Sequence, residues 1–153
     1  MALDNDVDLL GQQSLLGIMP REALRLLAFS AETRFLRAGD ILFRKGEVAD
    51  CGYIVVTGAI ALDVRDDGSP AIEIAGPGYL LGETALFAEL ARPATALARE
   101  TSTVMRLPRS VMVRVLGEFP DAAVAIHDAI AARVRSMAHQ LQDVRQTMSA
   151  IDP

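Results

Sequence analysis

Glycines divide the middle of the chain, residues 31–107, into short segments with the composition of β-strands. In "YIVVTGAIALDV" an apolar run gives way to alternation, which places Ile60, Leu62 and Val64 on one face. The turn "RDDGSP" and the alternating run "AIEIAG" complete a hairpin, and "TSTVMRL" is a last strand rich in β-branched residues. Many short strands joined by glycine turns predict a barrel or a roll of two sheets and argue against a βαβ fold.

Helices are predicted on both sides of this β region. In "SLLGIMPREALRLLAF" the apolar residues recur at helical spacing, and Pro20 opens a second helix. After the β region, Pro108 begins a short helix that ends near Gly117, and Pro120 opens a long helix without a breaker. We therefore expect one α+β domain with a mainly β core. Its N-terminal helices, β-roll and C-terminal helices are expected in residues 1–30, 31–107 and 108–153.

The long C-terminal helix carries a narrow apolar stripe whose members step by four and three residues in strict alternation. The stripe consists of Ile130, Val134, Met137, Leu141, Val144, Met148 and Ile151. Such a repeat is a heptad seam, and polar side chains flank it here. Either the seam joins two copies of the chain in a homodimer, or it packs on the chain's own roll. We favour the homodimer because the stripe is narrow and long.

Composition and charge narrow the class of protein. With 51% hydrophobic residues among 153, the chain can build a core and is not expected to be disordered. Its net charge of −5 argues against DNA or RNA as the main partner, because phosphate binding needs a concentrated basic face. No apolar run approaches the roughly 18 residues that span a bilayer, so no membrane partner is expected. The acidic start and the single cysteine, Cys51, predict a cytoplasmic protein without internal disulfides.

Residue types that carry catalysis or bind metals are not gathered in this sequence. His127 and His139 lie far from any cysteine or acidic cluster with metal-ligand spacing, so we expect no metal site. The sequence has neither a G-x-S-x-G nucleophile motif nor a Walker loop. We therefore expect no catalytic residues and a protein that binds rather than catalyses.

One stretch, "GYLLGETALFAELARPATALA", combines small residues with a glutamate and an arginine. A short helix entered from Gly82 would present N–H groups to an anion, and Thr84 and Ala85 leave its first turn open. Arg92 would meet the same anion with its guanidinium fork. Glu83 suits a ligand that also carries hydroxyl donors, so a sugar phosphate is a coherent ligand. Alternatively, Glu83 and Arg92 pair with each other and bind nothing.

Three runs carry a resemblance: "LRAGDILFRKGEVADCGYIVVTGAIAL", "GPGYLLGETALF" and "ARPATA". Their shared pattern includes Gly39–Asp40, Gly46–Glu47, Tyr53 with Gly58, Gly82–Leu86 and Arg92–Thr95. With this pattern the chain resembles the cyclic-nucleotide-binding domain of catabolite-activator-type regulators, cyclic-nucleotide-gated channels and the regulatory subunits of cyclic-AMP-dependent protein kinase. The resemblance covers about Leu15 to Val144.

This resemblance implies an eight-stranded antiparallel β-roll, or jelly roll, flanked by helices. Glu83 matches the acid that holds the ribose 2′-hydroxyl, and Arg92 matches the arginine that pairs with the cyclic phosphate. Gly82, Thr84 and Ala85 match the backbone that closes on ribose and phosphate. In this family, binding repositions the C-terminal helix, which transmits the signal.

One departure from the family's pattern lies beside the phosphate. Pro93 and Ala94 follow the arginine, and the family uses the position of Pro93 to donate a backbone N–H that proline lacks. Losing one hydrogen bond to a charged oxygen costs about 1.5–3 kcal/mol, which is roughly ten- to a hundredfold in affinity. The family often has a hydroxyl at this position as well, and a threonine there resembles a preference for cyclic GMP. Because Pro93 has no hydroxyl, the resemblance favours cyclic AMP as the ligand, with cyclic GMP as the alternative.

A second departure concerns the base. The helix positions that read the purine amino group in the activator fall on Met137 and Ala138, so Met137 is either an apolar base lid or a seam residue. The activator continues into a helix-turn-helix, whereas this chain ends at Pro153, so we expect no contact with DNA.

We predict a dimeric sensor of a cyclic nucleotide, with cyclic AMP favoured, that signals through its C-terminal helices. The competing hypothesis is a degenerate member of the family that has lost its ligand and serves as a protein-interaction or dimerisation module. That hypothesis predicts an ion pair between Glu83 and Arg92.

Overall fold

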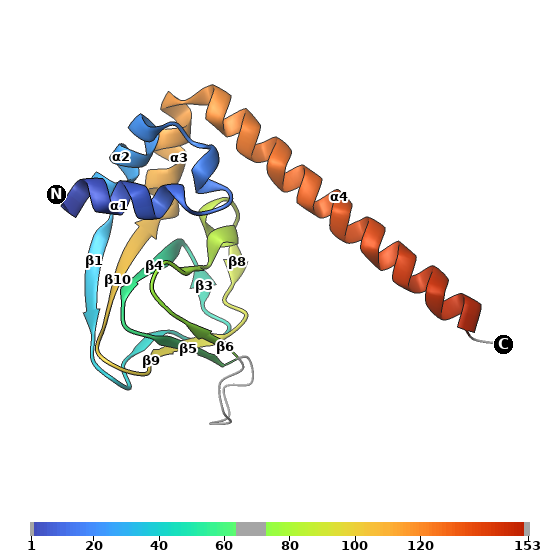
Figure 1. The fold of residues 1–153 in the computed structure, drawn as a ribbon, viewed down its shortest axis with the longest axis horizontal. Helices are drawn as coiled ribbons and strands as arrows, with labels where there is room; N and C mark the ends of the chain where they lie inside the picture. Colours follow the sequence, from blue (N-terminus) through green and yellow to red (C-terminus); the bar gives the residue numbers. More distant parts are fainter. Residues whose placement is uncertain (1, 64–72, 152–153) are drawn as a thin grey trace.

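The computed structural model describes residues 2–63 and 73–151 of the chain. A layer of helices covers one end of a β-roll, and a long helix leaves this layer and extends away from the roll (Figure 1). The helical elements are α1 (Ala2–Gly11), the 3-10 helix η1 (Leu16–Ile18), α2 (Arg21–Ser30), the 3-10 helix η2 (Glu83–Leu86), α3 (Arg109–Glu118) and α4 (Pro120–Ile151).

The β-roll consists of two four-stranded sheets and one two-stranded ladder, and all described strand pairs are antiparallel. The first sheet has the order β1 (Glu32–Leu36), β10 (Ser102–Pro108), β4 (Cys51–Thr57), β7 (Leu80–Leu81). The second has the order β2 (Ile41–Phe43), β9 (Thr95–Ala98), β5 (Ile60–Asp63), β6 (Glu73–Ala75). The ladder joins β3 (Val48–Ala49) to β8 (Leu90–Ala91). The predicted antiparallel roll is therefore confirmed, with ten described strands because the ladder adds to the two sheets.

The predicted hairpin is formed by β5 and β6, where Ile60 lies opposite Ala75 and Leu62 opposite Glu73. Its turn, "RDDGSP", and Val64 lie outside the described residues. The two faces of β5 do not differ as exposed and buried, since Ile60 on one face and Ala61 on the other are both buried. Both faces of β5 are therefore covered in the folded chain.

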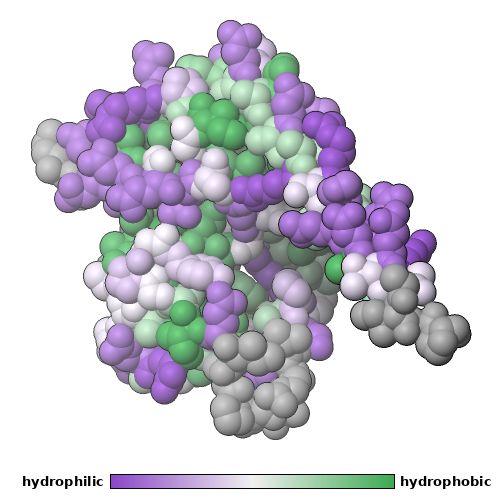
Figure 2. Space-filling model, turned by 45° about the vertical axis from the view of Figure 1, so that its right-hand side comes forward, coloured by the Kyte–Doolittle hydropathy of each residue, from purple (hydrophilic) through white to green (hydrophobic). Residues whose placement is uncertain are grey.

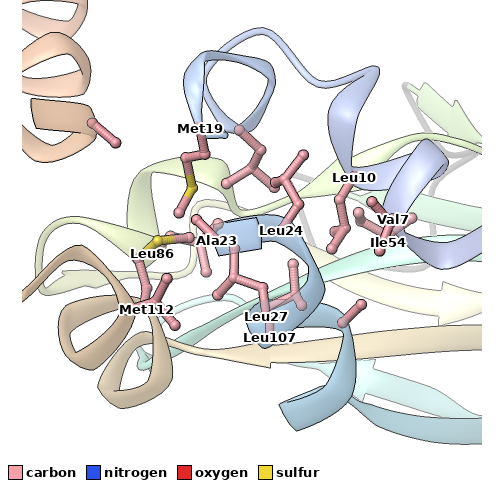
Figure 3. Packing of buried hydrophobic residues seen from close by; sticks show 14 of the residues in the cluster. Val7, Leu10, Met19, Ala23, Leu24, Leu27, Ile54, Leu86, Leu107 and Met112 are labelled. Atoms are coloured by element: carbon pink, nitrogen blue, oxygen red, sulfur yellow. The ribbon is translucent and has the colours of Figure 1, made fainter. Parts of the chain in front are cut away.

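Strand β4 divides the core into two clusters because its side chains alternate between two faces. Ile54 points to the helices and joins Leu10, Leu27, Leu107 and Met112 in the helical cluster (Figure 3). Cys51, Tyr53 and Val55 belong instead to the cluster inside the roll, together with Phe43, Ile60 and Val104. The alternation thus brings Cys51 and Tyr53 to the interior of the roll.

Helix α4 packs on the body of the protein only near its start. Ile130 packs against the helical cluster, whereas Val134, Met137, Leu141, Val144 and Met148 are between 55% and 70% exposed. The face of α4 visible in Figure 2 is mainly hydrophilic, as expected of a helix with one narrow apolar stripe. These five seam side chains therefore do not pack on the chain's own roll. Among the described residues, no helix combines the length and the apolar character that a membrane crossing requires.

Candidate functional site

Gly82 links β7 to η2 in the left-handed conformation, with φ 75° and ψ 38°. A Cβ at this position would lie 2.4 Å from Nη1 of Arg92, so a side chain would have to displace the guanidinium. The structure thus brings together two of the predicted site residues. The predicted short helix is the four-residue η2, in which the Ala85 N–H already donates to the Gly82 carbonyl at 3.0 Å.

The side chain of Arg92 is buried, with 5% of its surface exposed. Nη2 donates to the Cys51 carbonyl at 2.8 Å and lies 3.3 Å from the Cys51 sulfur. The guanidinium carbon stands 4.2 Å from the ring centroid of Phe43 and 5.7 Å from that of Tyr53. In the part of the chain that the structure describes, no carboxylate forms an ion pair with Arg92.

The backbone around Arg92 is fixed by the turn that precedes β3. The Arg92 N–H donates to the Glu47 carbonyl at 2.8 Å, and the Gly46 N–H donates to the Arg92 carbonyl at 2.9 Å. Three residues further on, Thr95 Oγ1 accepts from the Lys45 N–H at 2.9 Å. These bonds fix the backbone position of Arg92. The ring of Phe43 and the Cys51 carbonyl fix the position of its guanidinium.

A cavity of about 150 Å³ adjoins this guanidinium. Its walls include Phe43, Tyr79, Gly82, Arg92, Pro93 and Ala94. Among the described contacts Arg92 makes side-chain hydrogen bonds through Nη2 alone, so Nε and Nη1 retain donors for a ligand. The cavity is smaller than the roughly 300 Å³ at which small-molecule pockets begin, so a nucleotide would have to widen it.

Glu83 does not pair with Arg92. Its carboxylate accepts from Nη1 of Arg133 on α4 at 2.8 Å, and Arg133 also donates to the hydroxyl of Ser14. The ion pair expected from the competing hypothesis, Glu83 with Arg92, is therefore wrong for the described residues. The physical reason is geometric: the Arg92 guanidinium lies against Gly82 and the Cys51 carbonyl, whereas the Glu83 carboxylate lies against Arg133 of α4.

The remaining predicted residues lie around this point in different environments. Thr84 and Pro93 are exposed, whereas Ala85 and Ala94 are buried. The Ala85 carbonyl accepts from Nη1 of Arg109 at 3.2 Å, which ties η2 to the start of α3. Met137 is 62% exposed on α4 and is not among the residues that line the cavity.

Burial raises the pKa of the Tyr53 phenol, and its hydrogen bond and charge interaction with Cys51 raise it further. Arg34 and Arg106 lower it by smaller amounts. A phenol is neutral at physiological pH with or without this shift, so Tyr53 presents an uncharged ring to Arg92. The described residues include no group of three or more His, Cys, Asp or Glu side chains that could hold a metal ion.

Sequence reasoning missed three residues of this site, namely Phe43, Cys51 and Arg133. Alternation along β4 could have placed Cys51 beside Tyr53 on one face. No local signal, however, pairs Phe43 with Arg92, because the two meet only through the arrangement of the roll. In the sequence, Arg133 is only one of the polar residues that flank the seam, and its contact with Glu83 depends on how α4 leaves the body.

The fold and this site define an antiparallel β-roll with a buried arginine at a small cavity. The family described as "Cyclic nucleotide-binding domain" matches residues 33–119 of the chain. The chain therefore belongs to the cyclic-nucleotide-binding domain family.

Two solved structures are similar to the chain beyond this matched segment. A cyclic nucleotide-binding-like protein from Brucella abortus is 46% identical, with a TM-score of 0.69, over 74% of this chain and 99% of that one. The N-terminal domain of a transcriptional regulator from Streptomyces coelicolor A3(2) is 29% identical, with a TM-score of 0.78, over 88% and 95% of the two chains.

The curated relatives are much longer proteins. A lysophospholipase of Neurospora crassa is 30% identical over 121 residues, which are 78% of this chain. The chain spans only 8% of the length of that relative. The similarity therefore concerns one segment of a large enzyme.

Proposed function

We propose that this protein is a receptor for a cyclic nucleotide, with cyclic AMP as its ligand, and that it signals through the position of its C-terminal helices. The observation that carries the proposal is Arg92, a buried guanidinium that lies against Gly82 at a cavity and has no described carboxylate partner. A buried charge is costly unless an opposite charge compensates it. An anionic phosphate in the cavity would supply that charge.

The ligand is expected to bind with its phosphate on Nε and Nη1 of Arg92 and its ribose hydroxyl on Glu83. The missing side chain of Gly82 lets the phosphate approach the guanidinium closely. Pro93 offers neither an N–H nor a hydroxyl, so affinity is expected to be modest. The absence of a hydroxyl there supports cyclic AMP over cyclic GMP.

The ion pair between Glu83 and Arg133 supports a route from the site to α4. A ribose hydroxyl on Glu83 would share the carboxylate with Arg133, whose guanidinium now lies 2.8 Å away. Because Arg133 lies on α4 directly before the exposed seam residue Val134, weakening this pair would free the helix to take another position. The exposed seam beyond it is the surface through which we propose that two copies of the chain associate.

Isothermal titration of the full chain with cyclic AMP and cyclic GMP tests the ligand. Arg92→Ala should weaken binding about ten- to a hundredfold, because hydrogen bonds to charged groups contribute about 1.5–3 kcal/mol. Arg99→Ala is the matched control, since Arg99 is an exposed arginine seven residues further along the chain. Absence of heat with both nucleotides at high micromolar concentration, or unchanged binding by Arg92→Ala, would overturn the proposal.

The second candidate is a degenerate member of the family that serves as a dimerisation or protein-interaction module. Two observations favour it: the cavity is small, about 150 Å³, and Pro93 removes a donor beside it. This candidate predicts that no cyclic nucleotide raises the melting temperature of the protein. A dose-dependent increase with cyclic AMP, absent in Arg92→Ala, would contradict it.

A further inference from the structure

We propose that Phe43 is a positioning residue for Arg92, whose guanidinium it holds by cation–π attraction with the free N–H groups toward the cavity. This inference rests on the proposed function, because it concerns how the same site is prepared for an anion. Phe43 lies at the end of β2, and Arg92 directly follows β8. The two strands belong to different sheets, so strand pairing does not bring the two residues together.

The geometry is that of a desolvated cation–π pair. The guanidinium carbon of Arg92 is 4.2 Å from the centroid of the Phe43 ring, well within the distance of about 6 Å at which such pairs attract. Only 8% of Phe43 and 5% of Arg92 are exposed, so water screens the pair little. Tyr53 supports the ring from within the roll, with the two ring centroids 6.0 Å apart and an interplanar angle of 24°.

Three contacts together restrict the guanidinium. The Phe43 ring limits the plane in which it lies, and the Cys51 carbonyl, 2.8 Å from Nη2, limits its rotation within that plane. The absent side chain of Gly82 leaves room for Nη1, because a Cβ there would lie 2.4 Å from it. The donors that remain, on Nε and Nη1, are those that an anion would use.

An aromatic ring suits this task better than a carboxylate would. A carboxylate would neutralise the guanidinium and accept its N–H bonds, and it would then compete with the phosphate. A ring face attracts the cation through its quadrupole and leaves the net charge and the in-plane donors intact. Phe43 therefore stabilises a buried arginine that stays available to a ligand.

The test replaces Phe43 in the full chain with phenylalanines that carry one, two or three fluorines, which weaken the negative ring face with little change in size. The dissociation constant for cyclic AMP should rise steadily with each fluorine, by about two- to thirtyfold over the series. The same series at Phe29, an exposed ring on α2 away from the cavity, is the control and should leave the affinity unchanged.

A second measurement needs no ligand and separates this inference from the proposed function. Rotation of the Arg92 guanidinium, followed by nuclear magnetic resonance of its nitrogen-15 signals, should be slow in the unmodified protein and faster with each fluorine at Phe43. Unchanged rotation, or an affinity loss that merely follows the melting temperature, would overturn the positioning role. If no nucleotide binds but the rotation of Arg92 still responds to fluorine at Phe43, the proposed function is overturned and the positioning role of Phe43 remains supported.

Discussion

Gly82 has a left-handed backbone conformation and also lies against the guanidinium proposed to bind the ligand. Its φ of 75° is costly for any residue with a Cβ, and that Cβ would lie 2.4 Å from Nη1 of Arg92. Gly82→Ala should lower the free energy of unfolding by about 1–2 kcal/mol through backbone strain. Because it also pushes the guanidinium away, affinity for cyclic AMP should fall by at least about tenfold. Chemical denaturation and calorimetric titration measure the two effects.

Gly39→Ala is the control that separates the effect of backbone strain from the effect of displacing the Arg92 guanidinium. Gly39 has φ 92°, so alanine is strained there as well, but nothing lies within 4 Å of the added Cβ. We expect a comparable loss of stability with unchanged affinity for cyclic AMP. An equal affinity loss in both variants would mean that Gly82 acts through stability alone, contrary to the prediction.

At the residue scale, the sequence pattern was a good guide to which residues gather and a poor guide to their partners. The chemistry of Gly82 and Arg92 and the family resemblance indicate both as site residues, and in the structure they lie in contact. Glu83 was expected either at a ribose or on Arg92, yet it pairs with Arg133, fifty residues away. Partners such as this one depend on how distant elements dock, which a local pattern does not contain.

Helix α4 contacts the candidate site through Arg133 and also carries the exposed seam. Arg133→Gln removes the partner of Glu83 and keeps the helix intact, so the carboxylate becomes free to accept a ribose hydroxyl. Because the pair is partly exposed, it contributes about 0.2–1 kcal/mol, and affinity for cyclic AMP should rise by up to about fivefold. Calorimetric titration measures the change.

Arg135→Gln is the control for this prediction, since Arg135 is an exposed arginine on the same helix. Its affinity for cyclic AMP should equal that of the unmodified protein. A lower affinity in Arg133→Gln would show that Arg133 supports the bound state instead of competing with the ligand, and the proposed route from Glu83 to α4 would then be wrong.

The sequence predicted the long elements better than the short ones. Proline residues at 20, 108 and 120 stand at or directly before the starts of α2, α3 and α4, as expected of residues without an N–H. The two-residue strands β3 and β8 were not predicted. Backbone bonds such as that from the Gly46 N–H to the Arg92 carbonyl hold this part of the chain, and such bonds carry no side-chain signature.

For the whole molecule, the exposed seam of α4 is the main feature that a single copy leaves unexplained. Five apolar side chains at heptad spacing are 55–70% exposed, and exposed apolar stripes of this kind mark association surfaces. The heptad spacing was readable from sequence. The direction of α4 away from the roll was not, because it is set at the junction between α3 and α4, where Phe119 leaves the helical conformation.

Leu141→Lys places a charge in the centre of this seam, where a second copy would bury it in the proposed dimer, and should leave the chain monomeric. Leu141 is 70% exposed in the single chain, so the folded monomer should keep its stability. Gln142→Lys adds the same charge at a neighbouring exposed position outside the seam and should leave the dimer intact. Sedimentation equilibrium distinguishes the outcomes, and dimers in both variants would exclude the seam as the interface.

The same variant tests whether the dimer and the nucleotide influence each other. Arg133, which contacts Glu83, lies one residue before the seam residue Val134. If dimerisation changes the ligand affinity of each site, ligand binding must change the dimer's dissociation constant, and a dimer with two equivalent, independent sites changes it by the square of the per-site factor when both are filled. We therefore expect the cyclic AMP affinity of the Leu141→Lys monomer to differ from that of the proposed dimer. Saturating ligand should change the dimer dissociation constant of the unmodified protein by the square of that affinity ratio, because the dimer has two sites and each contributes the same coupling free energy. Identical affinities would mean that site and seam act independently.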